Sequence, residues 1–370
     1  MKRLLSILFS FIMMIVPLSA KAAPGAATAP VEYEKGIVLQ VIPIDKSMQK
    51  QYAMGEGEFV TLQLLSGPEK GKTVDTFNYV TGKSPYEIKV KPGDKIIVAI
   101  THDFGKTSYH VADFDRFDYV YVLLGIFMVC LIVFGGFIGI KSIFVIAFST
   151  LLIFKVFIGQ VLAAQFNLTL LALLLSAVIA VVTQITVSGP TIKSYAAIMG
   201  TVGGVTVAGA LSQAAIKLMY LNGLDTEEAM MLKASLLPNV DFEGLLFAGM
   251  IFGALGAVMD VTISISSALY EVKTIKPGAT IKELFVTGMN VGKDIMGTMS
   301  NTLILAYTGS ALPLMLLIAA QPNVSMTRIL NLNMIVTEIA RAMTGSIGLI
   351  CAIPLTAFIT AVMLQRKNLK

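Results

Sequence analysis

Charged residues are scarce in this sequence, and their scarcity excludes an ordinary soluble protein. They make up 14% of the 370 residues, whereas a soluble domain carries about 25%. Hydrophobic residues make up 55%, and the mean hydropathy is +0.78. After residue 118 the hydrophobic residues form blocks of about 20, a length that crosses a hydrocarbon layer roughly 30 Å thick. We therefore expect an integral membrane protein with a polar N-terminal domain.

Tryptophan is absent, and cysteine and histidine are rare. Any aromatic belt at the membrane surface must therefore come from tyrosine and phenylalanine. Both cysteines, Cys130 and Cys351, fall in predicted membrane spans, so the exported domain contains no disulfide. His102 and His110 are too few for a metal site without carboxylate help, and the sequence identifies no metal.

Recognisable enzymatic motifs are also missing. There is no phosphate-binding P-loop, no pair of metal-ligating histidines on a helix, and no serine elbow between a strand and a helix. The glycines from Gly200 to Gly204 lie inside a predicted span, which disfavours a nucleotide loop. The sequence thus predicts a protein that is not an enzyme and has no cofactor. Any transport would use a gradient or a partner ATPase.

The net charge of +5 comes without a basic run, so nucleic acid is not an expected partner.

The first 22 residues have the three parts of a secretory signal peptide. Lys2 and Arg3 precede the apolar stretch Leu4–Leu18, and Ala20-Lys21-Ala22 is a small-residue cleavage pattern. An uncleaved anchor is the alternative, and both place the next residues outside the cytoplasm. Residues 23–31, rich in alanine and proline, are expected to be a linker.

Residues 32–115 alternate between apolar and polar in the manner of strands. Strands are expected at Gly36–Ile42, Phe59–Leu65, Tyr86–Val90 and Lys95–Ile100, with a tight turn at Pro92-Gly93-Asp94. Five or six short strands in about 80 residues predict a small closed β-barrel, OB-like, on the extracytoplasmic side. Such a domain could bind a ligand or an envelope partner, but its residues select neither.

Residues 116–370 are expected to form a bundle of about seven transmembrane helices. The predicted spans are 118–140, 142–162, 167–187, 195–220, 244–268, 295–319 and 344–365. Lysine and arginine concentrate in the alternate loops that would be cytoplasmic, whereas the loop after the fourth span is acidic. This predicts a bacterial inner-membrane protein with its N-terminal domain outside and its C-terminus inside. The second span contains Lys155 and Gln160, so a kinked or re-entrant element is an alternative there.

Small residues recur every four positions in two spans. In the fourth span they are Ala196, Gly200, Gly204, Ala208 and Ser212. In the fifth, Gly249, Gly253 and Ala257 form one stripe, and Gly256, Asp260, Ser264 and Ala268 form its neighbour. Small residues let helix backbones approach closely in a membrane, so both spans are expected to pack on other helices. The surplus of stripes also allows a homo-oligomer.

Asp260 is the most informative residue, because no other residue from Leu245 to Ala268 is ionisable. A charge near the bilayer centre costs from roughly 3 to more than 10 kcal/mol, so such residues pair, protonate or line a polar cavity. The functional hypothesis is a proton or cation site in a permeation path. The structural alternative is an acid that hydrogen-bonds to a neighbouring helix.

The densest polar surface enters the sixth span. Asp294, Thr298 and Asn301 share a helical face, and Thr302 lies one turn after Thr298. We expect this surface to face the bundle interior, where its oxygens would suit a hard cation or helix–helix hydrogen bonds. Pro313 predicts a kink further along the same span.

A second polar stripe precedes the seventh span. Its members are Asn333, Thr337, Arg341 and Thr344, and Glu338 lies three residues before Arg341, at pairing distance on a helix. The stripe is either an amphipathic lead-in at the outer interface or an outer gate closed by this ion pair. Pro354 permits a bend within the span.

Several of these motifs resemble the YibE/F-like family of bacterial multi-pass membrane proteins. The resemblance covers most of the chain after the signal and is densest at Gly253–Val261 and Gly297–Leu303. Further matching positions are Gly36-Ile37-Val38, Gly93-Asp94, Ala306-Tyr307, Leu312-Pro313, Glu338, Ile339, Arg341, Gly345–Gly348 and Pro354–Thr356. The resemblance implies a membrane protein of the kind usually described as a permease, and it implies no ligand or catalytic residue.

Two hypotheses of function follow. The leading one is a gradient-driven transporter of an ion or small solute, with Asp260 facing the polar surface of the sixth span. The alternative is an envelope protein whose exported β domain binds a ligand or partner, with the helices as scaffold or signal relay. A membrane-embedded enzyme is third, because no nucleophile–base pair is recognisable.

Overall fold

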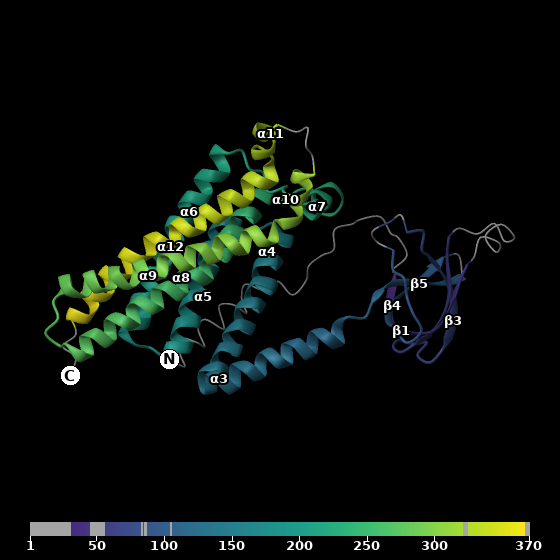
Figure 1. Ribbon diagram of the computed structural model, residues 1–370, viewed down its shortest axis with the longest axis horizontal. Helices are drawn as coiled ribbons and strands as arrows, with labels where there is room; N and C mark the ends of the chain where they lie inside the picture. Colours follow the sequence, from purple (N-terminus) through teal and green to yellow (C-terminus); the bar gives the residue numbers. More distant parts are fainter. Residues whose placement is uncertain are drawn as a thin grey trace. The chain divides into compact units, whose positions relative to one another are not determined.

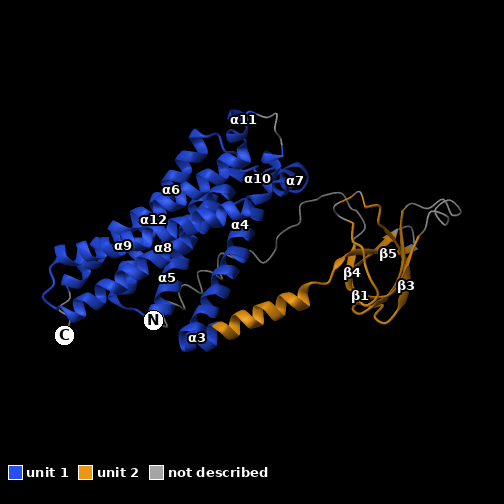
Figure 2. Ribbon diagram, in the orientation of Figure 1, with its two compact units in different colours: residues 1–23, 131–370 blue, residues 24–130 orange. Residues whose placement is uncertain are grey.

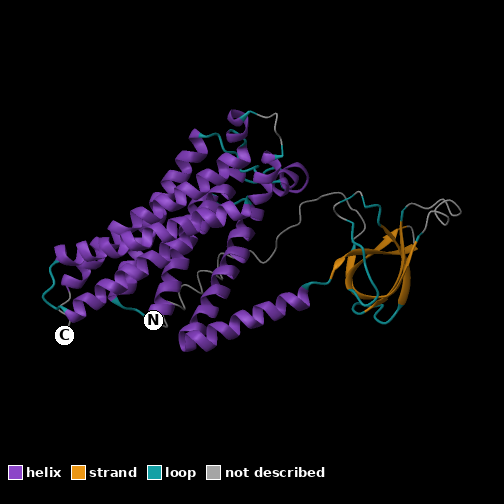
Figure 3. Cartoon of the chain, viewed as in Figure 1, coloured by secondary structure: helices purple, strands orange, loops and turns teal. Residues whose placement is uncertain are grey.

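The described residues of the chain form two compact units. The computed structural model describes residues 31–44, 56–82, 84, 87–103, 106–320 and 325–366. Described residues up to Cys130 belong to one unit and those from Leu131 onward to the other (Figure 2). The first is mainly strands and the second mainly helices (Figure 3). The predicted signal peptide (1–22), nearly all of the predicted linker, and Lys367 and Lys370 lie outside the described residues.

Five antiparallel strands form a single sheet in the first unit. They are β1 (Glu32–Pro43), β2 (Gly57–Leu64), β3 (Thr73–Tyr79), β4 (Lys95–Asp103) and β5 (Lys106–Phe114). Their order in the sheet is β3-β2-β1-β4-β5. In β2, the side chains of Val60, Leu62 and Leu64 point to one face and are buried, which is the period-two alternation seen in the sequence. These residues form a core with Val38, Val74, Val90, Ile96, Val98 and Ile100.

The sheet curls so that its two edge strands approach one another. The Thr76 hydroxyl of β3 donates a hydrogen bond to the Tyr109 carbonyl of β5. The Tyr109 hydroxyl binds Glu69, and Lys72 donates to the same hydroxyl at 2.8 Å. Among the described strands, β3 and β5 share no backbone ladder. The predicted closed barrel is thus found only in part, as a curled five-stranded sheet.

The strand predicted at Tyr86–Val90 is wrong for its described part, and β3 and β5 were not predicted. Residues 87–90 pair with no strand, and Tyr86 lies outside the described residues. The Val90 N–H donates to the buried Glu58 carboxylate at 3.2 Å, and Asn78 donates to the Ile88 carbonyl at 2.7 Å. Side chains therefore replace the ladder bonds that a strand would make. The turn at Pro92-Gly93-Asp94 is confirmed: Gly93 has φ 94° and the Asp94 N–H donates to the Lys91 carbonyl at 3.1 Å.

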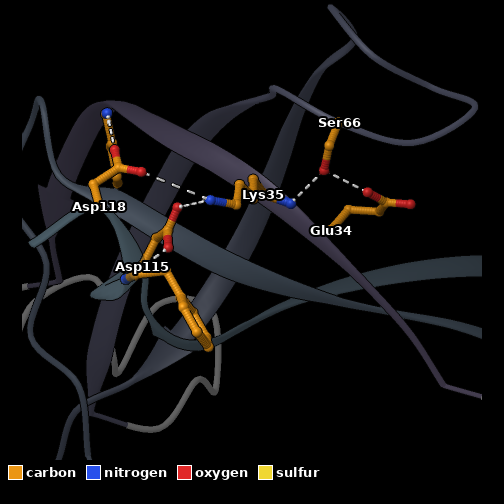
Figure 4. A network of polar contacts seen from close by, with 7 residues as sticks. Glu34, Lys35, Ser66, Asp115 and Asp118 are labelled. Atoms are coloured by element: carbon orange, nitrogen blue, oxygen red, sulfur yellow. Dashed lines mark hydrogen bonds and ion pairs between the residues drawn. The ribbon is translucent and has the colours of Figure 1, made fainter. Parts of the chain in front are cut away.

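A polar network joins the sheet to the helix that follows it, α3 (Phe117–Leu151). Asp115, whose side chain is 2% exposed, binds Lys35 of β1 at 2.7 Å. The same carboxylate accepts the Phe117 N–H at 3.3 Å, and Asp118 pairs with Lys95 at 2.6 Å. Figure 4 shows Lys35 between Asp115 and Ser66. The Lys35 backbone N–H donates to the Ser66 hydroxyl, which in turn donates to the Glu34 carboxylate. The hydrogen bond to Asp115 raises the pKa of Lys35 above its ordinary value.

The remaining described residues are mainly helical. After α3 come η1 (Leu152–Phe157), α4 (Ile158–Ala163), α5 (Leu168–Ser188), α6 (Ile192–Leu218), α7 (Glu227–Met231), η2 (Leu232–Leu236), α8 (Phe242–Ile275), α9 (Ile281–Ser310), α10 (Leu312–Ala319), α11 (Met326–Leu330) and α12 (Asn333–Arg366). Among the described residues, five helical segments are long and apolar enough to cross a membrane, or six if the bent pair α9–α10 is one span. These lengths and compositions are those of a membrane protein.

The bundle is centred on three long helices that contact one another, α6, α8 and α12 (Figure 1). Helix α5 packs on α6 and α8, and α9 packs on α8 and α12. Helices α6 and α12 approach closely, because a Cβ on Gly204 would lie 3.0 Å from the Gly348 carbonyl and 2.6 Å from Ala352. A Cβ on Gly200 would lie 2.0 Å from the Thr356 hydroxyl, and one on Gly348 would lie 2.5 Å from Ala208. The prediction that the fourth span is a packing helix is confirmed.

The segment Phe117–Ala163 is one continuous helical run of 47 residues that bends sharply at Gly136, which has φ 54° and ψ −130°. Lys155 lies in η1, a π-helical turn. The kinked or re-entrant element considered near Lys155 is found as a π-helical turn, and the sharp bend of the segment lies earlier, at Gly136. The break between α9 and α10 bends the chain by 61° beside Pro313, as predicted. Pro354 lies inside the unbroken helix α12.

Replacing Gly204 with leucine is expected to lower the free energy of unfolding by about 2–3 kcal/mol, because the larger side chain would separate α6 from α12. Gly125→Leu is the matched control, since no described heavy atom lies within 4 Å of its Cβ position. The measurement is the thermal midpoint of each variant in detergent. Equal midpoints for both variants would contradict the close contact between α6 and α12.

Candidate functional site

Asp260 lies on the exposed side of α8. It shares this side with Gly249, Gly253, Gly256 and Ser264, which are all exposed as well. The opposite side of α8 is buried against α6, α12 and α5. Among the described residues, none makes a hydrogen bond or ion pair with the Asp260 side chain. The carboxylate is therefore at the surface of this single chain and not in its core.

The polar surface of α9 also faces outward, which corrects the expectation that it would face the bundle interior. Asp294, Thr298, Asn301 and Thr302 are all exposed. The buried side of α9 is formed by Leu284, Gly288, Gly292 and Leu303. Cβ atoms on Gly288 and Gly292 would run into Ala357 and Ile353 of α12. Close packing on α12 thus requires the small residues inside, and the polar residues are left on the other side.

Contacts between α8 and α9 define the depth at which Asp260 lies. Gly253 lies beneath the Tyr307 hydroxyl, and a Cβ on Gly292 would be 3.4 Å from Ile265. The two helices are antiparallel, so this register brings Asp260 to the depth of Gly297–Ser300 in α9. Thr298 is therefore at the same depth as Asp260. Its hydroxyl donates to the Ile295 carbonyl at 2.9 Å, which leaves the oxygen lone pairs of the hydroxyl free to accept.

The predicted pathway residues thus form two exposed stripes on neighbouring helices. One contains Asp260 and Ser264, and the other contains Asp294, Thr298, Asn301 and Thr302. Carboxylate, amide and hydroxyl oxygens are acceptors that suit protons or hard cations. No group of three or more His, Cys, Asp or Glu side chains is placed to hold a metal in the described part of the chain.

The small residues predicted to pack helices fall into two classes. Gly200, Gly204 and Ala208 are buried between α6 and α12, and Gly253 of α8 lies against the Tyr307 hydroxyl of α9. Gly249 and Gly256 have no described heavy atom within 4 Å of their Cβ positions. Within this chain, these two α8 glycines therefore pack on no other described helix, which differs from the expectation.

The predicted pair Glu338–Arg341 is confirmed at 2.6 Å. Arg341 also lies 3.6 Å from Asp225, whose side chain is 8% exposed. One guanidinium therefore stands between two carboxylates. A shallow hollow of about 190 Å³ lies beside them, lined by Asp225, Thr226, Ser310, Ala311, Leu314, Met334 and Glu338. Asp225 was not predicted as a partner, because it lies in a loop where helical spacing indicates nothing.

A buried hydroxyl network was also missed. Gln184 of α5 donates to Thr201 of α6 at 2.8 Å, and Thr201 lies 2.8 Å from the Thr262 hydroxyl of α8. About three turns further along α6, Ser212 donates to Thr344 of α12 at 3.1 Å. These buried contacts join neutral side chains, whereas Asp260 and Asp294 lie on the exposed sides of α8 and α9.

Replacing Arg341 with leucine is expected to destabilise the protein by about 2–3 kcal/mol, because Glu338 and Asp225 would lose their cationic partner. This is less than the roughly 3–5 kcal/mol for a fully buried pair, since the side chains of Arg341 and Glu338 are 24% and 22% exposed. The double variant Arg341→Leu, Glu338→Leu should regain part of the loss. Thermal unfolding of the three proteins measures this, and an unchanged midpoint in Arg341→Leu would refute a structural role for the pair.

Comparison with known proteins identifies the family. No curated protein and no solved structure matches the chain. Residues 34–114 match the YibE/F family N-terminal domain. Residues 123–366 match the family described as YibE/F-like protein, which covers the described helices from the first turns of α3 to the end of α12. The chain is therefore a member of the YibE/F-like protein family.

Proposed function

We propose that this chain is a gradient-driven transporter of an ion or small solute in the bacterial inner membrane. The observation that carries the proposal is the unpaired Asp260 carboxylate on the exposed side of an apolar helix. If this carboxylate faced hydrocarbon in its charged form, the cost in free energy would be roughly 3 to more than 10 kcal/mol. Water, a proton or a cation at the α8–α9 surface would remove that cost, and the exposed oxygens of α9 extend such a path.

Seven crossings with the N-terminal domain outside are part of the proposal. The segment Phe117–Ala163 has 47 residues, a helical length of about 70 Å at 1.5 Å per residue, which is more than twice the hydrocarbon thickness. The bend at Gly136 divides this segment into two pieces of spanning length. With α9–α10 as one bent span, the total becomes seven, and lysine and arginine then concentrate in the cytoplasmic loops.

Asp260→Asn is expected to abolish flux while leaving folding intact, because the amide keeps the shape but can neither take up a proton nor neutralise a cation. Proton, sodium and potassium flux into liposomes would be measured for both proteins. Glu271→Gln is the matched control, since it removes an exposed carboxylate near the C-terminal end of the same helix. Normal flux in Asp260→Asn would refute the proposed role of this acid.

A second candidate function rests on an aromatic patch of the β domain, defined as Phe59, Phe77 and Tyr79. The three rings lie on the face of β2 and β3 opposite to the core, with centroids 5.4 Å apart for Phe59–Phe77 and 4.6 Å apart for Phe77–Tyr79. Tyr79 is 66% exposed. Exposed aromatic clusters are common in binding surfaces, so the patch suits an envelope ligand or partner.

If the β domain is the working part, Phe77→Ser with Tyr79→Ser should abolish function, and Asp260→Asn should be tolerated. The measurement is complementation of a deletion strain by each variant. The control Thr73→Ser with Asp75→Asn changes the same face of β3 without touching the rings. Full complementation by the aromatic double variant would exclude this second function.

A further inference from the structure

The hollow beside Arg341 lies where the break between α9 and α10 faces the first two turns of α12. Its volume is about 190 Å³, which is below the roughly 300–1,000 Å³ of pockets for drug-sized ligands. Its apolar lining includes Leu314 and Met334, and its polar lining consists of Asp225, Thr226, Ser310 and Glu338. A hollow of this size and lining suits a small polar solute.

The two acids of this hollow carry more negative charge than their basic partner neutralises. Arg341 binds Glu338 at 2.6 Å and lies 3.6 Å from Asp225. Arg341 and Asp225 are also the charged groups that act electrostatically on Glu338. One positive charge therefore stands against two negative charges, and the hollow favours a positively charged ligand.

The fold itself does not satisfy Asp225. Its side chain is 8% exposed and lines the hollow, and no described residue donates a hydrogen bond to its carboxylate. One oxygen of Glu338 is likewise buried and has no donor among the described residues. A carboxylate that is buried without hydrogen bonds destabilises a fold, and a single acid would suffice for an ion pair with Arg341. The second acid thus indicates a donor that comes from outside the chain.

The hydroxyl groups of the hollow provide further acceptors. The Ser310 hydroxyl donates to the Tyr307 carbonyl at 2.8 Å, which leaves its oxygen lone pairs free to accept. The Thr226 oxygen accepts the Ala229 N–H at 3.2 Å and keeps a second lone pair. The lining therefore complements a cation that donates several hydrogen bonds. A primary ammonium group is such a cation, because it has three N–H donors and no acceptor.

An ammonium group suits this lining better than a metal ion does. Calcium takes about six to eight oxygen ligands, and magnesium requires near-octahedral geometry. The described residues contain no group of three or more His, Cys, Asp or Glu side chains placed to hold a metal, and the guanidinium of Arg341 would repel a divalent ion. Leu314 and Met334 also offer an apolar surface to an alkyl chain, which a bare ion lacks.

We propose that this hollow binds a small organic cation that carries a primary ammonium group and a short alkyl chain. The ammonium group donates to the carboxylates of Asp225 and Glu338 and to the Ser310 oxygen. The alkyl chain lies against Leu314 and Met334.

Binding in this hollow does not require that the chain transports. Tyr307, one turn before Ser310, relates the hollow to Asp260, because its hydroxyl lies against Gly253 of α8. Asp260 follows seven residues after Gly253, about 10 Å along the helix. If the chain transports, the hollow is the first binding site on the way to Asp260. Binding without flux would leave this inference standing and would count against the proposed function alone.

Saturation-transfer NMR on the purified full-length chain in detergent tests the site, with n-butylammonium chloride as the probe at constant ionic strength. We expect saturable binding to the wild type. Asp225→Asn keeps the shape of the side chain but removes its charge, so it should raise the dissociation constant about tenfold to a hundredfold. Glu228→Gln is the matched control, since it removes an exposed carboxylate three residues further along that does not line the hollow.

Three outcomes of this titration would overturn the proposal. The first is the absence of saturable binding in folded wild-type protein. The second is a dissociation constant for Asp225→Asn that equals that of Glu228→Gln. The third is displacement of the probe by sodium or potassium at concentrations similar to its own dissociation constant, which would show a site for simple monovalent ions.

A second variant separates loss of the site from loss of folding. Ser310→Ala removes an acceptor without touching the ion pairs of Arg341, so its thermal midpoint should equal that of the wild type. We expect it to raise the dissociation constant of n-butylammonium about threefold to tenfold. Unchanged binding in Ser310→Ala would contradict the proposed position of the ammonium group, whatever the stability of Asp225→Asn.

The alkyl part of the ligand has its own test. Leu314→Ala should weaken n-butylammonium by at least about threefold and methylammonium by less, because the longer probe buries more apolar surface. Leu312→Ala changes a residue of the same helix that is 58% exposed and does not line the hollow, so it should affect neither probe. Equal losses for both probes in Leu314→Ala would contradict an alkyl chain in this hollow.

Discussion

The arrangement of the helical bundle depends on the close approach of α6 and α12 at Gly204 and Gly348. Each glycine lies at the other's carbonyl, so neither helix can carry a side chain at the crossing. Once α12 is held there, α9 can pack on it only through Gly288 and Gly292. The polar side of α9 must then turn away from the bundle. The exposed position of the polar surface of α9 is thus a consequence of the close backbone packing between α6, α12 and α9.

Periodicity in the sequence showed which residues share a helix face but not which way the face points. It correctly identified the small stripe of α6, the pair Glu338–Arg341 and the break beside Pro313. It failed for the polar face of α9, because in a membrane both the interior and an uncovered surface are plausible places for polar groups. Only the contacts of Gly288 and Gly292 with α12 decide between them.

The β domain shows a different limit. Alternation predicted the segment ending at Val90 as a strand, since Ile88 and Val90 do point toward apolar surroundings. Its backbone bonds go instead to Glu58 and Asn78, two side chains distant in sequence. β3 was missed because its inward positions include Thr76 and Asn78 as well as Val74, so its apolar alternation is weak. A buried polar residue that serves another segment of backbone leaves no local pattern.

The junction at Asp115 has a mechanical consequence. Its carboxylate holds β1 through Lys35 and the first turn of α3 through Phe117, while Asp118 of α3 is tied to β4 through Lys95. The start of α3 is therefore attached to two strands of the sheet, β1 and β4. Any turning of α3 about its own axis would pull on both strands. A load applied to the sheet would therefore reach the first turn of α3 through these contacts.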